Sequence, residues 1–194
     1  PQRTIVYDFP NSSVEEVTVK TGGTTATRTR KEYASVGGAL ELTKVTAGYG
    51  TVDLVTDYTY FTSSGSQGGY RKLESVTRPD GSWTRFAYYE SPIETRGQVY
   101  RVFSPYLDAP ATAASATTSN SKVVEYLYEA DWSGKNRRPF SIATTINGVA
   151  TGQVDVDYVD SSVDSRPLVT ETRTAYEKAP SSSSAAQTTT LKYY

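Results

Sequence analysis

Four aspartates near the C-terminal end have the residue type and spacing best suited to chemistry. Asp155, Asp157, Asp160 and Asp164 offer oxygen ligands of the kind that calcium prefers. Strand alternation would place Asp155 and Asp157 on one face. The segment lacks the glycine spacing of an EF-hand loop or of a calcium-binding nonapeptide repeat, however. We therefore interpret it as a solvated strand face, with Asp155, Asp157 and Asp160 as weak metal candidates, and expect a fold that needs no metal and no cofactor.

Two missing residue types restrict the catalytic chemistry that remains. The sequence contains no His and no Cys, which removes the commonest general base, the commonest zinc ligand and thiolate nucleophiles. A glycosidase pair of carboxylates is still open as a third, weaker function. Nothing in the sequence pairs two of the acids, so we expect a protein that is not an enzyme. The acids considered are Glu41, Asp53, Asp57, Glu74, Glu125 and Glu129.

Aromatic side chains offer binding chemistry, because their flat faces stack on sugar rings. The chain has 16 Tyr and 2 Trp. Exposed indoles at Trp83 and Trp132 would support ligand binding, and a carbohydrate-binding or adhesive β-domain is the alternative function. Tyrosines can instead pack their rings inside a sheet and leave the hydroxyl at a polar edge. The direction of Tyr88, Tyr128 and Tyr176 separates the two cases, because inward rows indicate a scaffold and an exposed coplanar set indicates sugar binding.

The elements that carry these residues are predicted to be strands. The sequence holds 28 Thr and 16 Tyr against 8 Leu, a composition that favours β-structure over helix. Apolar and polar residues alternate in segments separated by turn residues, and Asn147-Gly148 is a strong two-residue hairpin signal. The predicted strands are Thr4 to Phe9, Val14 to Lys20, Leu40 to Thr46, Val52 to Phe61, Tyr70 to Thr77, Trp83 to Tyr89, Val99 to Phe103, Lys122 to Tyr128, Phe140 to Ile146, Gln153 to Tyr158, Leu168 to Tyr176 and Thr188 to Tyr194.

Two tracts interrupt the alternation. Residues 109–120 are rich in Ala, Ser and Thr, and residues 179–187 in Ser and Ala. Both lack apolar bulk, so we predict exposed loops there, with only weak support for a helix in the first. The glycine pairs at 22–23, 37–38 and 68–69 lack the Lys-Ser/Thr of a phosphate loop and indicate turns. No domain boundary is visible, and residues 1–194 are expected to form a single run of hairpins.

The stretch from Leu73 to Tyr88 has the most specific pattern in the chain. An extended segment leads into a Pro-Asp-Gly turn, and a second extended segment follows, which predicts a β-hairpin. Pro79 sets the φ that the turn needs, and Gly81 accepts the positive φ that a side chain would resist. The residues that carry the pattern are Leu73, Val76, Pro79, Asp80, Gly81, Arg85 and Tyr88.

This spacing, L-x-x-V-x-x-P-D-G-x-x-x-R-x-x-Y, resembles the YD (tyrosine-aspartate) repeat of the Rhs, teneurin and toxin-complex shell group. Degenerate copies extend the resemblance over most of the chain. It departs from the repeat where Tyr89 follows Tyr88 and Glu177 follows Tyr176, because the family has Asp at that place. The other residues that match are the dipeptide Tyr7-Asp8, the Arg-x-x-Tyr elements Arg30 to Tyr33 and Arg173 to Tyr176, and Tyr128.

The resemblance implies a fold and a function. YD repeats form antiparallel hairpins that stack into a spiralling β-sheet, a shell or solenoid, so the tyrosines would be structural. The chain would be a non-enzymatic wall segment of an exported Rhs/YD-repeat protein, serving cargo encapsulation or cell contact. Its partners would be neighbouring repeats of a parent chain or other copies of itself, and glycans under the alternative function. Its location would be secreted or at the bacterial cell surface.

Charge and hydropathy exclude other partners. The 20 Lys and Arg nearly balance the 21 Asp and Glu, and they are scattered, so we expect no nucleic-acid partner. No apolar run approaches the roughly 20 residues that cross a bilayer as a helix, so we expect no membrane insertion. The start at Pro1, with neither a signal peptide nor an initiator Met, suggests a processed or excised piece.

Overall fold

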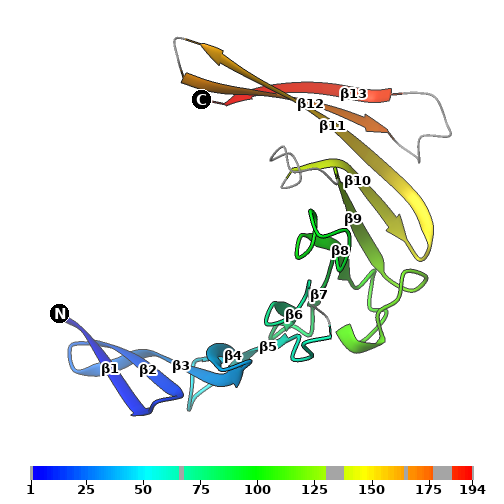
Figure 1. Ribbon diagram of the computed structural model, residues 1–194. Helices are drawn as coiled ribbons and strands as arrows, with labels where there is room; N and C mark the ends of the chain where they lie inside the picture. The colour runs from blue at the N-terminus through cyan, green and yellow to red at the C-terminus, as the bar shows by residue number, and fades with distance from the viewer. Residues whose placement is uncertain (1, 66–67, 130–137, 164–165, 177–184, 194) are drawn as a thin grey trace. The chain divides into compact units, whose positions relative to one another are not determined.

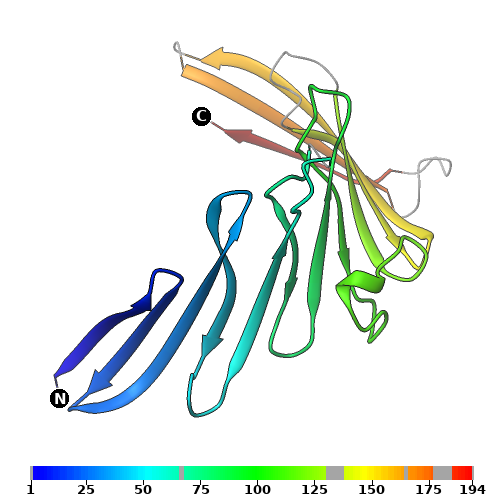
Figure 2. The ribbon, with the colours of Figure 1, turned by 60° about the horizontal axis from the view of Figure 1, so that its bottom comes forward.

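The chain folds almost entirely as β-structure. The computed structural model describes residues 2–65, 68–129, 138–163, 166–176 and 185–193. Its 13 strands form one open sheet in which the strands lie side by side in sequence order, from β1 at one edge to β13 at the other (Figure 1). Neighbouring strands run antiparallel and are joined as hairpins (Figure 2). The predicted all-β fold of stacked antiparallel hairpins is confirmed.

The chain divides into two compact units, which the sequence did not reveal. The first unit comprises residues 1–66 and 70–84. Its strands are β1 (Arg3–Asn11), β2 (Val14–Thr21), β3 (Thr24–Val36), β4 (Ala39–Ala47), β5 (Leu54–Tyr60), β6 (Leu73–Thr77) and the first two residues of β7 (Trp83–Tyr88).

The second unit comprises residues 67–69 and 85–194. It contains the remainder of β7 and one short 3-10 helix, η1 (Ala113–Ser115). Its other strands are β8 (Val99–Ser104), β9 (Lys122–Tyr128), β10 (Pro139–Ile146), β11 (Val149–Val163), β12 (Arg166–Tyr176) and β13 (Ala185–Tyr193).

Twelve of these strands overlap a predicted segment, and β3 does not. Its N-terminal half, from Thr24 to Lys31, alternates Thr with Ala, Arg and Lys, so no apolar face marks it as a strand. A second difference lies at the start of β6. The predicted strand begins at Tyr70, whereas Arg71 has a φ of 62° and the strand starts at Leu73.

Tight glycine turns set the register of several hairpins. Asn147 and Gly148 have φ values of 50° and 79° between the paired residues Ile146 and Val149, as a type I′ turn requires. The glycine pairs at 22–23 and 37–38 also have positive φ at both positions. These predictions are confirmed. The pair at 68–69 also lies in a turn, where Gly68 approaches the backbone of Tyr89.

The predicted Pro-Asp-Gly turn is also present. Gly81 has a φ of 80°, and its amide donates to the carbonyl of Arg78 at 2.9 Å. The amide of Ser82 donates to the Asp80 carboxylate at 2.9 Å. Hydrogen bonds from Ser82 hold the pKa of Asp80 below its usual range, because they favour the charged carboxylate.

Replacing Gly81 with Val is expected to destabilise the fold by on the order of 1–2 kcal/mol or more. A Cβ at this position would meet nothing within 4 Å, so the cost comes from the left-handed backbone alone. Gly81→Asn is the matched control, since Asn tolerates this conformation. Urea denaturation followed by circular dichroism measures both variants, and equal midpoints for G81V and the wild type would contradict the turn.

A β-bulge recurs beside a tyrosine in five strand pairs. In each pair, one step along the tyrosine strand corresponds to two steps along the next strand, which leaves one extra residue there. Tyr33, for example, pairs with Leu42, and Glu32 pairs with Lys44, so Thr43 is extra. The five tyrosines are Tyr33, Tyr60, Tyr88, Tyr128 and Tyr176, and the extra residues are Thr43, Glu74, Tyr100, Phe140 and Ala186.

The bulge explains the three-residue spacing of Leu73 and Val76. Residues three apart in a regular strand point to opposite faces. Because Glu74 is extra, Leu73 pairs with Tyr60 and Val76 with Tyr58, which share one face. Equivalent pairs on the strands that follow Tyr33, Tyr88 and Tyr128 are Leu42 with Val45, Val99 with Val102, and Pro139 with Ile142. The three-residue apolar spacing that recurs in the sequence thus corresponds to a bulge that recurs in the strand pairing.

Little of the described sheet is buried. Eight apolar residues are buried, whereas 16 large ones are exposed. Every residue of β1 is exposed, with Tyr7 at 62% and Phe9 at 66%. Several of the other exposed apolar residues lie in loops between strands.

The two predicted loops need partial correction. Most of 109–120 is exposed, but Ala113 and Ala116 around η1 are buried. An alanine side chain is small enough to be buried at such a turn without a large apolar core around it. In the second tract, residues 185–187 belong to β13 and are paired with β12. Residues 179–184 lie outside the described part of the chain.

Candidate functional site

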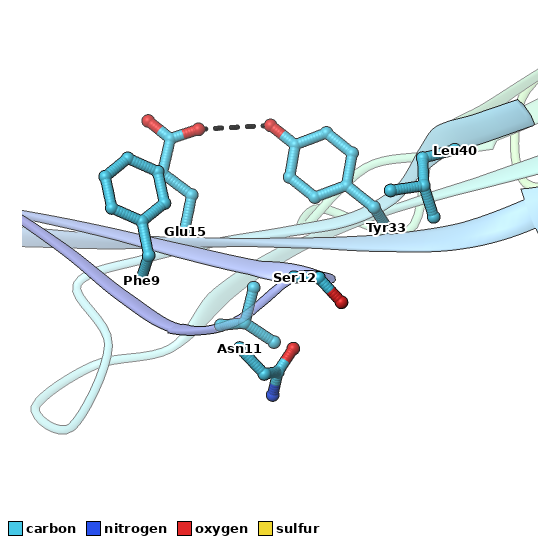
Figure 3. A pocket seen from close by; sticks show the side chains of 7 residues that line it. Phe9, Asn11, Ser12, Glu15, Tyr33 and Leu40 are labelled. Carbon is cyan, nitrogen blue, oxygen red and sulfur yellow. Dashed lines mark hydrogen bonds between the residues drawn. The ribbon is translucent and has the colours of Figure 1, made fainter.

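A hollow with mixed polar and apolar walls lies at the β1–β2 turn. Its volume is about 550 Å³, within the usual range of about 300–1,000 Å³ for small-molecule sites. Phe9, Glu15, Tyr33 and Leu40 stand on one side of the strands (Figure 3). They come from four consecutive strands, β1 to β4. We call these four residues, with Asn11, Ser12 and Val14 at the turn, the β1–β4 groove.

Backbone and side-chain hydrogen bonds at the turn position this groove. The Asn11 side chain accepts from the amide of Ser13 at 2.8 Å, which closes the turn between β1 and β2. The carbonyl of Ser13 then accepts from the amide of Tyr33 at 2.9 Å. These contacts place Phe9 and Glu15 beside Tyr33, although 18 residues separate Glu15 from Tyr33 in the sequence.

Glu15 is the only carboxylate that lines the groove. It accepts from both sides, with Lys31 Nζ at 3.2 Å from each oxygen and Tyr33 Oη at 3.1 Å. Burial, followed by this hydrogen bond to Glu15, raises the pKa of Tyr33 above its ordinary value, so the phenol is a neutral donor near pH 7. A glycosidase uses two acids, and this lining contains one carboxylate.

The four aspartates do not form one cluster in the described structure. Asp155 accepts from Ser141 Oγ at 2.9 Å and from Gln153 Nε2 at 2.6 Å. Asp160 instead pairs with Arg138 at 2.8 Å. No three His, Cys, Asp or Glu residues of the described chain gather as a metal site would require. Asp164 lies outside the described residues, and independence from metal stays a prediction.

Four of the other candidate acids each have a separate partner. Glu41, Asp57 and Glu125 lie 3.7, 3.8 and 2.5 Å from Arg71, Lys44 and Arg101, respectively. Asp53 accepts from the amide of Gly50 at 3.0 Å. Each of these carboxylates therefore has a structural partner nearby.

No known family model matches the chain, and no curated protein does. The YD-repeat resemblance therefore depends on the residues themselves, and their positions can be compared with the expectation. The described part of the chain also contains no helix that is long and apolar enough to span a membrane.

The first Arg-x-x-Tyr element places its two residues on opposite faces of β3. Arg30 donates to Glu16 at 3.2 Å, while Tyr33 donates to the adjacent Glu15. Arg28 reaches the other oxygen of Glu16 at 2.6 Å. Glu16 itself is only 6% exposed, so these charge-assisted bonds compensate its desolvation. The element links β2 to β3 from both faces.

In the other two Arg-x-x-Tyr elements the arginine has different partners. Arg85 donates to the carbonyl of Ala116 at 3.3 Å and lies over the ring of Phe103, at 5.9 Å from its centroid. Arg173 forms an ion pair with Glu171 on the same strand. Tyr88 and Tyr176 are half-buried, and each follows a bulge in its strand pair.

Two tyrosine hydroxyls at or next to the bulges donate to backbone carbonyls of the sheet. Tyr60 donates to the carbonyl of Leu42 at 2.8 Å. Tyr89 donates to the carbonyl of Tyr126 at 3.0 Å, and its ring meets that of Tyr128 edge-on at 5.9 Å between centroids. Burial raises the pKa of Tyr128 to about 12. Tyr88, Tyr128 and Tyr176 are half-buried, unlike a fully exposed sugar-binding row.

The remaining predicted positions differ more. Tyr7 and Asp8 are exposed on β1. Trp83 is only 2% exposed and enters β7 facing inward, so its indole gives no support to ligand binding. Trp132 lies outside the described residues. Phe9, Glu15 and Leu40 were not foreseen, because only the strand register brings them to Tyr33.

Proposed function

We propose that this chain is a non-enzymatic structural segment of an exported YD-repeat protein of the Rhs and toxin-complex type. It would form part of a β-shell wall or of a surface assembly, either secreted or at a bacterial cell surface. The observation that carries the proposal is the sheet order, in which each hairpin lies next to its sequence neighbours. Such stacking lets repeats be added without rearranging those already present.

The recurring bulge supports the same function. Five tyrosine-bearing strands meet a partner with one extra residue, so successive hairpins repeat a pairing rule that goes beyond a general β-preference. Bulges bend and twist a sheet locally. A β-sheet that curves into a shell wall would need such bends at intervals.

The strands at both ends of the order support continuation of the sheet. β1 pairs only with β2, and β13 pairs only with β12, among the described strands. An edge strand presents unpaired backbone groups that can pair with another chain. The neighbours would be further repeats of a parent chain or other copies of this one.

We expect the isolated chain to associate through these edges as its concentration rises. Light scattering against concentration measures this for the wild type and for Leu191→Pro, which removes a backbone donor from β13. Leu191→Thr is the control, since it shortens the side chain and keeps the donor. Wild-type association that L191T retains and L191P weakens is the expected result.

Circular dichroism checks that each variant is folded. If L191P is unfolded, Tyr7→Pro on β1 tests the opposite edge of the sheet instead. A wild-type chain that stays monomeric at high concentration would contradict the continuous wall. The same conclusion would follow if the folded proline variants associated as the wild type does.

A further inference from the structure

The β1–β4 groove combines two aromatic rings with one carboxylate. The ring of Phe9 is 66% exposed, and Figure 3 shows it beside Glu15, with the Tyr33 hydroxyl turned toward the same carboxylate. Leu40 extends the apolar wall beyond Tyr33. A ligand here would meet flat apolar surface and a strong hydrogen-bond acceptor together.

The charges at the groove disfavour charged ligands of either sign. Glu15 contributes the only negative charge of the lining, and Lys31 Nζ lies 3.2 Å from both of its oxygens. A cationic ligand would have to compete with Lys31 for this carboxylate. An anionic ligand would face Glu15 with no arginine or lysine in the lining to bind it.

Hydrogen-bonding capacity remains for a neutral ligand. A carboxylate offers about four lone-pair sites, and the hydrogen bonds from Lys31 and Tyr33 occupy part of them at Glu15. The Asn11 oxygen accepts from the amide of Ser13. Asn11 and Ser12 line the hollow from the turn and point to the side of the strands opposite to Glu15 (Figure 3).

We propose that the β1–β4 groove binds an uncharged saccharide. A pyranose ring has an apolar face of C–H groups and a rim of hydroxyls, and the groove offers an exposed phenyl face next to a carboxylate. The ring of Phe9 would stack on the sugar, and Glu15 would accept from its hydroxyls. The site lies within the first four strands, so this proposal does not require the wall function.

Isothermal titration calorimetry of the full chain with maltotriose, cellotriose and triacetylchitotriose tests the proposal, supported by a printed array of neutral and acidic glycans. We expect millimolar or tighter binding to at least one neutral glycan. Phe9→Ala should weaken that binding about tenfold or more, which corresponds to about 1.4 kcal/mol. Phe9→Trp, which keeps a flat ring, should retain it.

Tyr7→Ala is the matched control. Tyr7 is a similarly exposed aromatic residue on the same strand, at 62%, and it does not line the groove. Its loss should change the affinity less than twofold. Three outcomes would overturn the proposal: no neutral glycan binds, only acidic glycans bind, or F9A and Y7A weaken binding equally. None of them bears on association through β1 and β13, so the two proposals fail separately.

Discussion

Replacing Trp83 with alanine is expected to lower the free energy of unfolding by about 3–5 kcal/mol, the usual cost of removing a large aromatic core residue. Trp83 is 2% exposed and is the largest fully buried side chain of the described chain. Few apolar residues are buried, so the sheet has little other core to compensate. Against a total stability of about 5–15 kcal/mol, this one change would remove a large share of the stability at the lower end of that range.

Urea denaturation followed by far-ultraviolet circular dichroism measures this effect, because the variant loses the main fluorophore of the described residues. Tyr7→Ala is the control, since it truncates an aromatic residue that is 62% exposed and should cost within about 0.5 kcal/mol. Trp83→Phe should fall between the two. If W83A and Y7A shift the midpoint equally, the indole contributes no core packing.

Trp83 also shows where sequence reasoning stops. Alternation located β7 and the turn before it, because both depend on local chemistry at Pro79, Asp80 and Gly81. The burial of one indole depends on which neighbours cover it. The sequence did not decide whether this indole was exposed for binding or buried in the core, and in the structure it is buried.

The pairing register of β2 with β3 also could not be predicted from local sequence signals. The two-residue turn at 22–23 brackets Thr21 and Thr24, and regular pairing from there would put Glu15 opposite Arg30. The bulge between Val19 and Lys20 moves Glu15 opposite Lys31 instead. The groove therefore depends on one extra residue in β3, between Thr25 and Thr27, which no turn residue in the sequence predicts.

One sequence feature did contain information about register. A spacing of three between Leu73 and Val76 conflicts with the two-residue period of a strand, and it recurs between Leu42 and Val45. In the structure both spacings coincide with a bulge. Odd apolar spacing inside a predicted strand is thus a physical signal for a bulge. β3 gave no comparable signal, because polar Thr, Arg and Lys occupy both of its faces.

The last prediction concerns Gly68, where two chain segments of the second unit approach closely. A Cβ built on Gly68 would lie 1.9 Å from the carbonyl oxygen of Tyr89 and 2.8 Å from its carbon. That oxygen also accepts from the amide of Gly97 at 2.9 Å. The amide of Gly68 itself donates to Glu90 at 2.8 Å. Only glycine fits here, and the reason is space.

Gly68→Ala must therefore displace backbone, and we expect a loss of about 1–3 kcal/mol in the free energy of unfolding. Gly65→Ala is the matched control from the same loop, because its Cβ would approach only the Ser63 hydroxyl, at 3.4 Å. Urea denaturation compares the two, and hydrogen exchange at the amide of Gly97 reports on the displaced carbonyl. G68A should speed that exchange and G65A should not. Equal midpoints and unchanged exchange in both variants would show that the backbones of Gly68 and Tyr89 do not pack closely.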